Sequence, residues 1–243
     1  MSGFGAIGMG GHLLGAVSLG TAIGEVIKPP APAQMGCFVV GTMILTAEGE
    51  KAVETLSEGD VLVTASGERM PLVWLGRRTI DTVRAPNRLQ ILPVRIQAGA
   101  FAEGVPHRDL FVSADHAMLL AGVLVPAMKL INGGTIAQVE VDEVTYFHVE
   151  CERHVVLVAN GAAAESYLET DNRGFFSNAP GSVDLHPTLT IAERRALLAA
   201  PWVNREQIAV IRQANLKRAE AMGYVAQYNN EAAEAAVRPR RIA

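Results

Sequence analysis

The stretch that decides the fold is residues 37–67, which read CFVVGTMILTAEGEKAVETLSEGDVLVTASG. Short runs rich in Val, Ile, Leu and Thr alternate here with Ala-Glu-Gly-Glu, Ser-Glu-Gly-Asp and Ser-Gly turns. Apolar runs of about 4–8 residues between such turns are typical of β-strands. The pattern continues to about Leu168, and no helical period of comparable length competes with it. It predicts a compact, mainly β domain over residues 37–170, in which Asp60 anchors a turn.

The segment before this domain differs from it in composition. Residues 3–27 are apolar and rich in glycine, and they carry no charge before Glu25. No positively charged start precedes the apolar run, so a standard signal peptide is not expected. Two roles stay open for this arm, association with a membrane and oligomerisation or docking on a partner, and the cellular compartment stays open with them. Residues 28–36, KPPAPAQMG, form a proline-rich linker that stops any helix.

The chain after the β domain is predicted to be irregular at first and then helical. A first helix is expected at 190–200, where Thr190 and Glu193 form a capping box. A second helix is expected at 205–223, with Gly223 at its end. Its apolar stripe consists of Ile208, Ile211, Leu216 and Ala219. Residues 171–243 are therefore expected to form a C-terminal helical appendage that packs on the β body.

The bulk composition narrows the function classes. The chain has 243 residues, of which 49% are hydrophobic, and its formal net charge is -4. This mild charge gives no reason to expect a nucleic acid as partner. The two cysteines, Cys37 and Cys151, lack the paired spacing of zinc sites, so no metal and no cofactor are expected. A disulfide between them stays open from the sequence alone.

The pair Gly36–Cys37 is the most informative point of the chain. A cysteine at the first position of a folded β domain can attack the carbonyl of the residue before it, which converts the peptide bond into a thioester by an N-to-S acyl shift. The thiol must be deprotonated during the attack, and the amide nitrogen must be protonated to leave. A nearby histidine can supply that proton, while a hydroxyl can orient the amide or stabilise the oxyanion. Glycine at position 36 removes a side chain that would obstruct the turn.

The same stretch of sequence resembles a known family. From residue 37 to residue 168 it resembles the Hint domain, which inteins and the hedgehog C-terminal domain share, and it is most similar to the bacterial single-domain type. Gly36-Cys37-Phe38 is similar to the hedgehog cleavage junction. The likeness to bacterial relatives is carried by the order of several fragments, among them PLVWLGRR, PVRIQAGAF, RDLFVSADHAMLL and ESYL. The resemblance implies a flat, horseshoe-shaped β fold of two pseudo-symmetric halves, and it implies autoprocessing.

The resemblance also implies which residues are catalytic. Cys37 stands at the position of the nucleophile. In the family's second motif, Thr-x-x-His, the sequence SADH puts Ser113 at the threonine and His116 at the histidine that catalyses the acyl shift. The third motif is similar to TYFHVECERHVVLVANGAAAESYL, where His148 or His154 is implied to assist. The alternative for each is structural, since cysteine and histidine also occur in cores and Ser113 can be a plain strand hydroxyl.

Two departures from the family restrict the reaction. Splicing inteins end in His-Asn followed by Cys, Ser or Thr, and this end falls near Glu165-Ser166, where the asparagine is absent. Hedgehog proteins activate cholesterol with an aspartate, and the comparable strand, Pro71–Arg78, contains no acid. Full splicing and sterol transfer are therefore not expected. The predicted outcome is a thioester at Cys37 that water, a thiol or an amine resolves.

Three functions from different classes follow. The first and favoured one is a self-cleaving protein whose substrate is its own N-terminal segment. The second is a non-cleaving Hint scaffold, in which residues 1–36 and the C-terminal helices bind a protein partner. The region from His186 onward supports such docking, because it carries nine basic residues against five acidic ones. The third is a small peptidase that would use Cys37 and His116 on foreign substrates.

Overall fold

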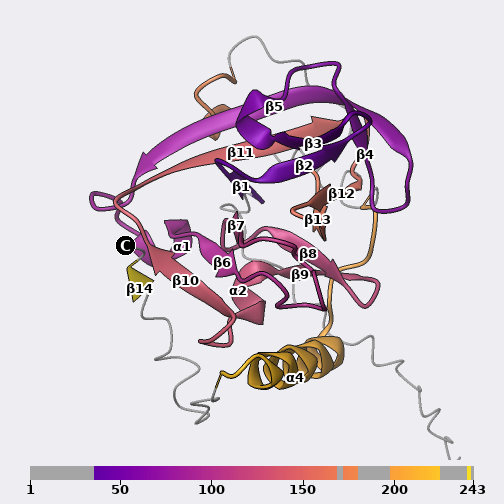
Figure 1. Ribbon diagram of the computed structural model, residues 1–243. Helices are drawn as coiled ribbons and strands as arrows, with labels where there is room; N and C mark the ends of the chain where they lie inside the picture. Colours follow the sequence, from indigo (N-terminus) through magenta and orange to yellow (C-terminus); the bar gives the residue numbers. More distant parts are fainter. Residues whose placement is uncertain (1–35, 169–171, 180–197, 225–239, 242–243) are drawn as a thin grey trace, which may run out of the picture.

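The computed structural model describes residues 36–168, 172–179, 198–224 and 240–241. In these residues fourteen strands form one curved sheet with the order β14-β10-β6-β7-β1-β11-β5-β4-β2-β12-β13-β8-β9, and β3 is added beside β2 (Figure 1). All pairs are antiparallel except β10 with β14. The predicted mainly β class is confirmed.

The elements have the following bounds. The strands are β1 (Phe38–Val39), β2 (Met43–Thr46), β3 (Gly49–Ala52), β4 (Val61–Val63), β5 (Arg69–Asp81), β6 (Val94–Ile96), β7 (Leu110–Val112), β8 (Ala117–Leu120), β9 (Val123–Pro126), β10 (Ile136–Glu140), β11 (Glu143–Cys151), β12 (Val156–Ala159), β13 (Ala162–Glu165) and β14 (Arg240–Arg241). The helices are η1 (Val53–Thr55), α1 (Arg88–Ile91), α2 (Ala127–Leu130), η2 (Arg173–Phe175) and α4 (Arg205–Ala221).

The long strands β5 and β11 link the two parts of the core. They pair over nearly their full length and arch together across the top of Figure 1. Side chains of β5 are buried at every second position, as a strand with one covered face requires. Met70 and Leu72 enter the main apolar cluster, whereas Trp74 enters a second, smaller cluster that contains Cys37. The same strand therefore connects the main core to the surroundings of the cysteine.

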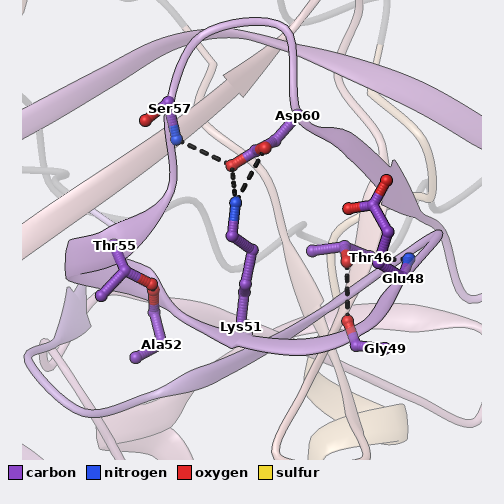
Figure 2. A network of polar contacts seen from close by, with 8 residues as sticks. All are labelled: Thr46, Glu48, Gly49, Lys51, Ala52, Thr55, Ser57 and Asp60. Atoms are coloured by element: carbon purple, nitrogen blue, oxygen red, sulfur yellow. Dashed lines mark hydrogen bonds and ion pairs between the residues drawn. The ribbon is translucent and has the colours of Figure 1, made fainter.

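The turn before β4 depends on Asp60, as predicted. The Asp60 carboxylate accepts two hydrogen bonds from Lys51 Nζ, at 2.9 and 2.7 Å, and one from the backbone N–H of Ser57 at 2.8 Å (Figure 2). These contacts, the Lys51 hydrogen bond first, lower the pKa of Asp60. Thr46 closes the neighbouring hairpin by donating to the Gly49 carbonyl at 2.7 Å. The structural role expected for Asp60 is confirmed.

Two short segments inside the β domain form helical turns rather than strands. Residues 88–91 make one helical turn, α1, because Pro93 cannot donate to a strand ladder and the pairing starts only at Val94. Residues 53–55 likewise turn into η1, where the Val53 N–H donates to the Thr42 carbonyl at 2.8 Å. Both turns are formed by backbone hydrogen bonds that the periodicity of the sequence does not reveal.

The predicted C-terminal helix at 205–223 is confirmed as α4. Asn204 caps its start with a full capping box to Gln207, and Gly223 follows its end at a φ of 88°. One position of the predicted stripe is wrong, since Asn215 is buried where Leu216 was expected and Leu216 is half-buried. Ile208 and Ile211 belong to the main cluster, and α4 lies against α2. The helix therefore completes the core rather than only covering it.

Other expectations fall largely beyond the described residues. The arm at 3–27 lies outside them. So does the helix predicted at 190–200, except for residues 198–200, which are not helical. None of the helices in the described part of the chain is long and apolar enough to cross a membrane.

Candidate functional site

Cys37 lies at the centre of the sheet, directly before β1. Phe38 of β1 pairs with Phe147 of β11 on one side and with Val112 of β7 on the other. The backbone that follows Cys37 is therefore fixed from both sides. Cys37 itself is a free thiol that is 1% exposed. The Gly36–Cys37 peptide bond is thus presented inside the protein and not on a surface loop.

Ser113 holds the amide of this peptide bond. Its hydroxyl oxygen accepts a hydrogen bond from the Cys37 N–H at 2.9 Å, and its own N–H donates to the Cys37 carbonyl at 2.9 Å. Ser113 can do this because it directly follows β7, the strand that pairs with β1. The hydroxyl therefore fixes the orientation of the nitrogen that would leave on cleavage.

His116 lies beside the same peptide bond. Its α-carbon would be 3.4 Å from a Cβ on Gly36, and its ring lies 4.3 Å from the Phe38 ring, centroid to centroid. Burial lowers the pKa of His116 to about 4, while Glu165 and the backbone of Gly36 and Cys37 act in the opposite direction. The ring is thus close to the backbone of Gly36 and Cys37, although within the described ranges neither ring nitrogen meets the geometry of a full hydrogen bond. At neutral pH the ring is therefore uncharged and can accept a proton.

The thiol of Cys37 is also uncharged at neutral pH. Burial raises its pKa well above the ordinary 9.0, and the Arg78 charge and the Ser113 hydroxyl lower it in part. Asp115 and Glu165 raise it further. Because only the thiolate is an effective nucleophile, the thiol needs a base during attack. The site thus combines a neutral acid and a neutral base around one peptide bond.

Glu165 is a buried residue of this site to which the sequence analysis gave no role beyond marking the place where an intein ends. It ends β13, and its Oε1 accepts a hydrogen bond from the Ala117 N–H at 2.8 Å. A Cβ on residue 36 would lie 2.5 Å from the same oxygen, so the present position of the Glu165 side chain fits glycine at residue 36 and would have to shift for a larger residue. An acid that ends the otherwise apolar strand Ala162–Glu165 is the signal that could have drawn attention to it.

His154 contacts Glu165 rather than the peptide bond. Its Nε2 lies 3.6 Å from Glu165 Oε2, and its Nδ1 accepts a hydrogen bond from the Ala199 N–H at 3.0 Å. Since Nδ1 is an acceptor, a neutral His154 carries its proton on Nε2, which faces the carboxylate. A direct role for His154 in the acyl shift stays a prediction, and the geometry places Glu165 between it and Gly36.

His148 lies among aromatic rings near the nucleophile. It makes edge contacts with Tyr167 at 4.8 Å and with Phe176 at 4.6 Å, measured between ring centroids. Burial and the nearby His116 lower its pKa well below 6.5. In the part of the chain that the structure describes, its ring nitrogens have no hydrogen-bond partner. Assistance by His148 in the acyl shift stays a prediction.

The aromatic rings around His148 close the site. Cys37 shares a cluster with the buried Trp74, Val144, Tyr146, Tyr167 and Phe176. Phe176 comes from residues 172–179, which we call the cover segment. Asn178 attaches this segment to β5, since its side chain accepts from the Arg77 N–H and donates to the Leu75 carbonyl, both at 2.8 Å. The cover segment therefore helps to exclude water from Cys37.

A buried ion pair fixes the start of the cover segment. Arg173 donates to both oxygens of Glu150 at 2.5 Å, and its guanidinium lies 4.4 Å from the centre of the Trp74 ring. Beside it, the Tyr167 hydroxyl donates to Asn172 at 2.6 Å. The ion pair was not predicted, because Arg173 and Glu150 lie on separate segments that only the fold brings together.

The remaining expectations concern the second cysteine and metals. Cys151 is a buried free thiol, so the disulfide with Cys37 that the sequence left open is not formed. Burial raises its pKa to about 12, as expected for a packed, unreactive thiol. Within residues 36–168, 172–179, 198–224 and 240–241, no group of three or more His, Cys, Asp or Glu side chains is arranged to hold a metal ion.

Comparison with known proteins assigns the chain to a family. A family model described as the Hint domain matches residues 36–171, more than half of the chain. The chain belongs to the Hint domain family. Membership supports autocatalytic processing in general. Among curated proteins, none matches this chain.

Solved structures of inteins are similar to the chain at low identity. The bacterial intein-like domain from Clostridium thermocellum is 18% identical, with a TM-score of 0.38, and the match covers 55% of this chain and 99% of that one. The gp41-1 intein is 12% identical at the same score, covering 54% and 98%. The DnaB intein from Synechocystis sp. PCC 6803 is 11% identical, also at 0.38, covering 55% and 99%. The assignment rests on the family match alone.

Proposed function

We propose that the protein cleaves its own chain at Gly36–Cys37 by an N-to-S acyl shift. The observation that carries the proposal is the hydrogen bond from the Cys37 amide to Ser113, with the neutral His116 ring beside the same bond. A core cysteine would need neither contact. Here the attacking sulfur, the carbonyl before it and the leaving nitrogen belong to adjacent residues, so proximity is built into the chain.

The first step moves one proton and exchanges one bond. His116 takes the thiol proton, and the thiolate attacks the Gly36 carbonyl carbon. The same proton is then given to the Cys37 nitrogen as the C–N bond breaks. The products are a thioester between Gly36 and the Cys37 sulfur and a free amine on Cys37. Ser113 keeps the nitrogen in place during the transfer.

The second step releases the N-terminal segment. A nucleophile attacks the thioester carbonyl, the C–S bond breaks and the Cys37 thiol is regenerated. Glu165-Ser166 stands where a splicing intein has its asparagine, so the outcome is cleavage or transfer of residues 1–36 and not splicing. Water, a thiol or an amine can serve as acceptor, and docking of a partner through the basic C-terminal helices stays a prediction.

A second candidate is a non-cleaving scaffold, and one observation favours it. Cys37 is protonated and 1% exposed, with Phe176 of the cover segment in its cluster, so the described conformation is a resting one. The same burial speaks against a peptidase for foreign substrates, because such a substrate would have to displace the cover segment to reach the sulfur.

The test is to follow the intact mass of the full chain with and without hydroxylamine or dithiothreitol. Self-cleavage predicts a fragment that starts at Cys37, that is absent in Cys37→Ala and that forms more slowly in His116→Ala. An unchanged mass of the wild type under all conditions would contradict self-cleavage and favour the scaffold. Mixing a Cys37→Ala chain with active protein tests the peptidase, which alone predicts cleavage of the mutant chain.

A further inference from the structure

We propose that Glu165 is the general base that activates water for attack on the Gly36 thioester, so that the N-terminal segment is released by hydrolysis. This inference rests on the proposed function, and it names the acceptor for its second step. The acyl shift gives Glu165 no role, yet its burial is unfavourable, because a carboxylate that is 8% exposed loses most of its hydration.

The position of Glu165 supports this role. Its Oε1 lies against the α-carbon of Gly36, so close that a Cβ there would be 2.5 Å from the oxygen. That α-carbon is bonded to the carbonyl carbon that water must attack. A base has to be within reach of the attacking molecule, directly beside the reacting carbon. In the described part of the chain, the Glu165 carboxylate lies this close to Gly36.

The contacts of Glu165 hold the carboxylate in place. The Ala117 N–H donates to Oε1 at 2.8 Å, and His154 Nε2 faces Oε2 at 3.6 Å. The Ala199 N–H donates to the other nitrogen of His154, which keeps the proton on the side facing Glu165. His154 is thus a positioning residue for Glu165, and its place in the third motif has an explanation apart from the acyl shift.

The proposed step balances as follows. Glu165 removes a proton from water as the water oxygen bonds to the Gly36 carbonyl carbon. The tetrahedral intermediate collapses, the C–S bond breaks, and the Cys37 sulfur leaves as a thiolate that takes the proton back. Residues 1–36 then end in a free carboxylic acid. Hydroxylamine and dithiothreitol are strong nucleophiles that attack a thioester without this base, so they separate the two steps.

The test compares Glu165→Gln with the wild type by intact mass, in buffer alone and in hydroxylamine. Glutamine keeps an oxygen for the Ala117 N–H but cannot accept a proton. We expect hydrolysis in buffer to fall about 100-fold, as for loss of a general base, with hydroxylamine cleavage within about threefold of wild type. Asp115→Asn is the matched control, since it also converts an acid near Cys37 into an amide, and it should change both rates alike.

The outcomes distinguish failure of this inference from failure of the proposed function. If hydroxylamine does not cleave the wild type, the acyl shift itself is absent. If hydroxylamine cleaves wild type and Glu165→Gln, but buffer hydrolyses both equally or neither, only the role of Glu165 is overturned. A parallel loss of both reactions in Glu165→Gln would also overturn it.

Two further measurements control for misfolding of the variant and identify the source of the oxygen in the new carboxyl group. Glu165→Asp keeps the carboxylate at a shorter reach, and partial recovery of hydrolysis with an unchanged melting temperature supports a base. Cleavage in heavy-oxygen water should place the label on the new carboxyl group of Gly36. Absence of the label would contradict hydrolysis as the releasing step.

Discussion

Two groups of residues around Cys37, which we call its polar side and its aromatic side, have opposite chemistry. The first group, the polar side, consists of Ser113, His116 and Glu165, each with a polar atom directed at or near the Gly36–Cys37 bond. The second group, the aromatic side, consists of Trp74, Tyr167 and Phe176, which share one apolar cluster with the cysteine. Under the proposed function the polar side transfers protons, and the aromatic side keeps water away from them.

Under the proposed function, the difference explains how a scissile bond can persist inside a folded protein. Burial keeps both the thiol and the imidazole neutral at pH 7, so neither of these two groups carries a charge before the transfer starts. In this proposal the polar side positions the groups that exchange the proton. The aromatic side contributes to the burial that keeps the thiol protonated before the proton transfer. Changing either side should therefore affect different measurements.

Removal of His116 should have the largest effect on the polar side. In His116→Ala we expect the hydroxylamine-induced cleavage rate to fall by about 10²–10⁴, because the thiol loses its base and the amide its acid. The rate is read from intact mass over time. His107→Ala is the control, since His107 bonds Glu50 on the surface and should leave the rate unchanged. Equal rates in both variants would contradict the role of His116.

Removal of Arg173 should have the largest effect on the aromatic side. Arg173→Ala leaves the buried Glu150 without the cation that binds both its oxygens, and we expect a loss of about 3–5 kcal/mol in the free energy of unfolding. Urea unfolding in a Cys37→Ala background measures it without cleavage. Arg153→Ala, which breaks an exposed pair with Glu68, should leave the urea midpoint unchanged. A similar loss in both would show that burial is not the cause.

A smaller effect is expected from the Ser113 hydroxyl. Ser113→Ala removes one hydrogen bond to the scissile amide, worth about 1.4 kcal/mol, and should slow hydroxylamine cleavage about tenfold. Ser113→Thr keeps the hydroxyl and should stay near the wild-type rate. A slow threonine variant would mean that the size of the side chain matters more than the hydrogen bond.

The smallest effect concerns pH and Asp115. Burial first, and then the Glu165 charge, raise the pKa of Asp115 from 3.8 to about 6. A raised pKa in the folded state gives stability that is complete below 3.8 and is lost as the pH rises through about 6. Asp115→Asn, again in the Cys37→Ala background, should therefore raise the melting temperature above that of its parent at pH 8. At pH 4 the two melting temperatures should differ much less. A gain at pH 4 alone would reverse the sign and contradict the assignment.

The sequence predicted what local pattern and motif encode. Alternating apolar runs indicated the β class, and the motif around SADH indicated Ser113 and His116 beside Cys37, which the structure brings together. Glu165 was missed because its contact with Gly36 joins residues far apart in the chain. The burial of Asn215 in place of Leu216 was missed because a helical stripe does not show which neighbour covers each position.

The contact between Gly36 and Glu165 sets a rule for what can be joined to this protein. Any polypeptide fused upstream in place of the natural arm meets the Glu165 oxygen at its final residue, where even one methyl group is excluded unless that carboxylate moves. Cargo ending in glycine fits without change. Cargo ending in alanine or a larger residue requires the Glu165 side chain, which accepts a hydrogen bond from Ala117, to shift, so the last position of the cargo is coupled to the placement of that carboxylate.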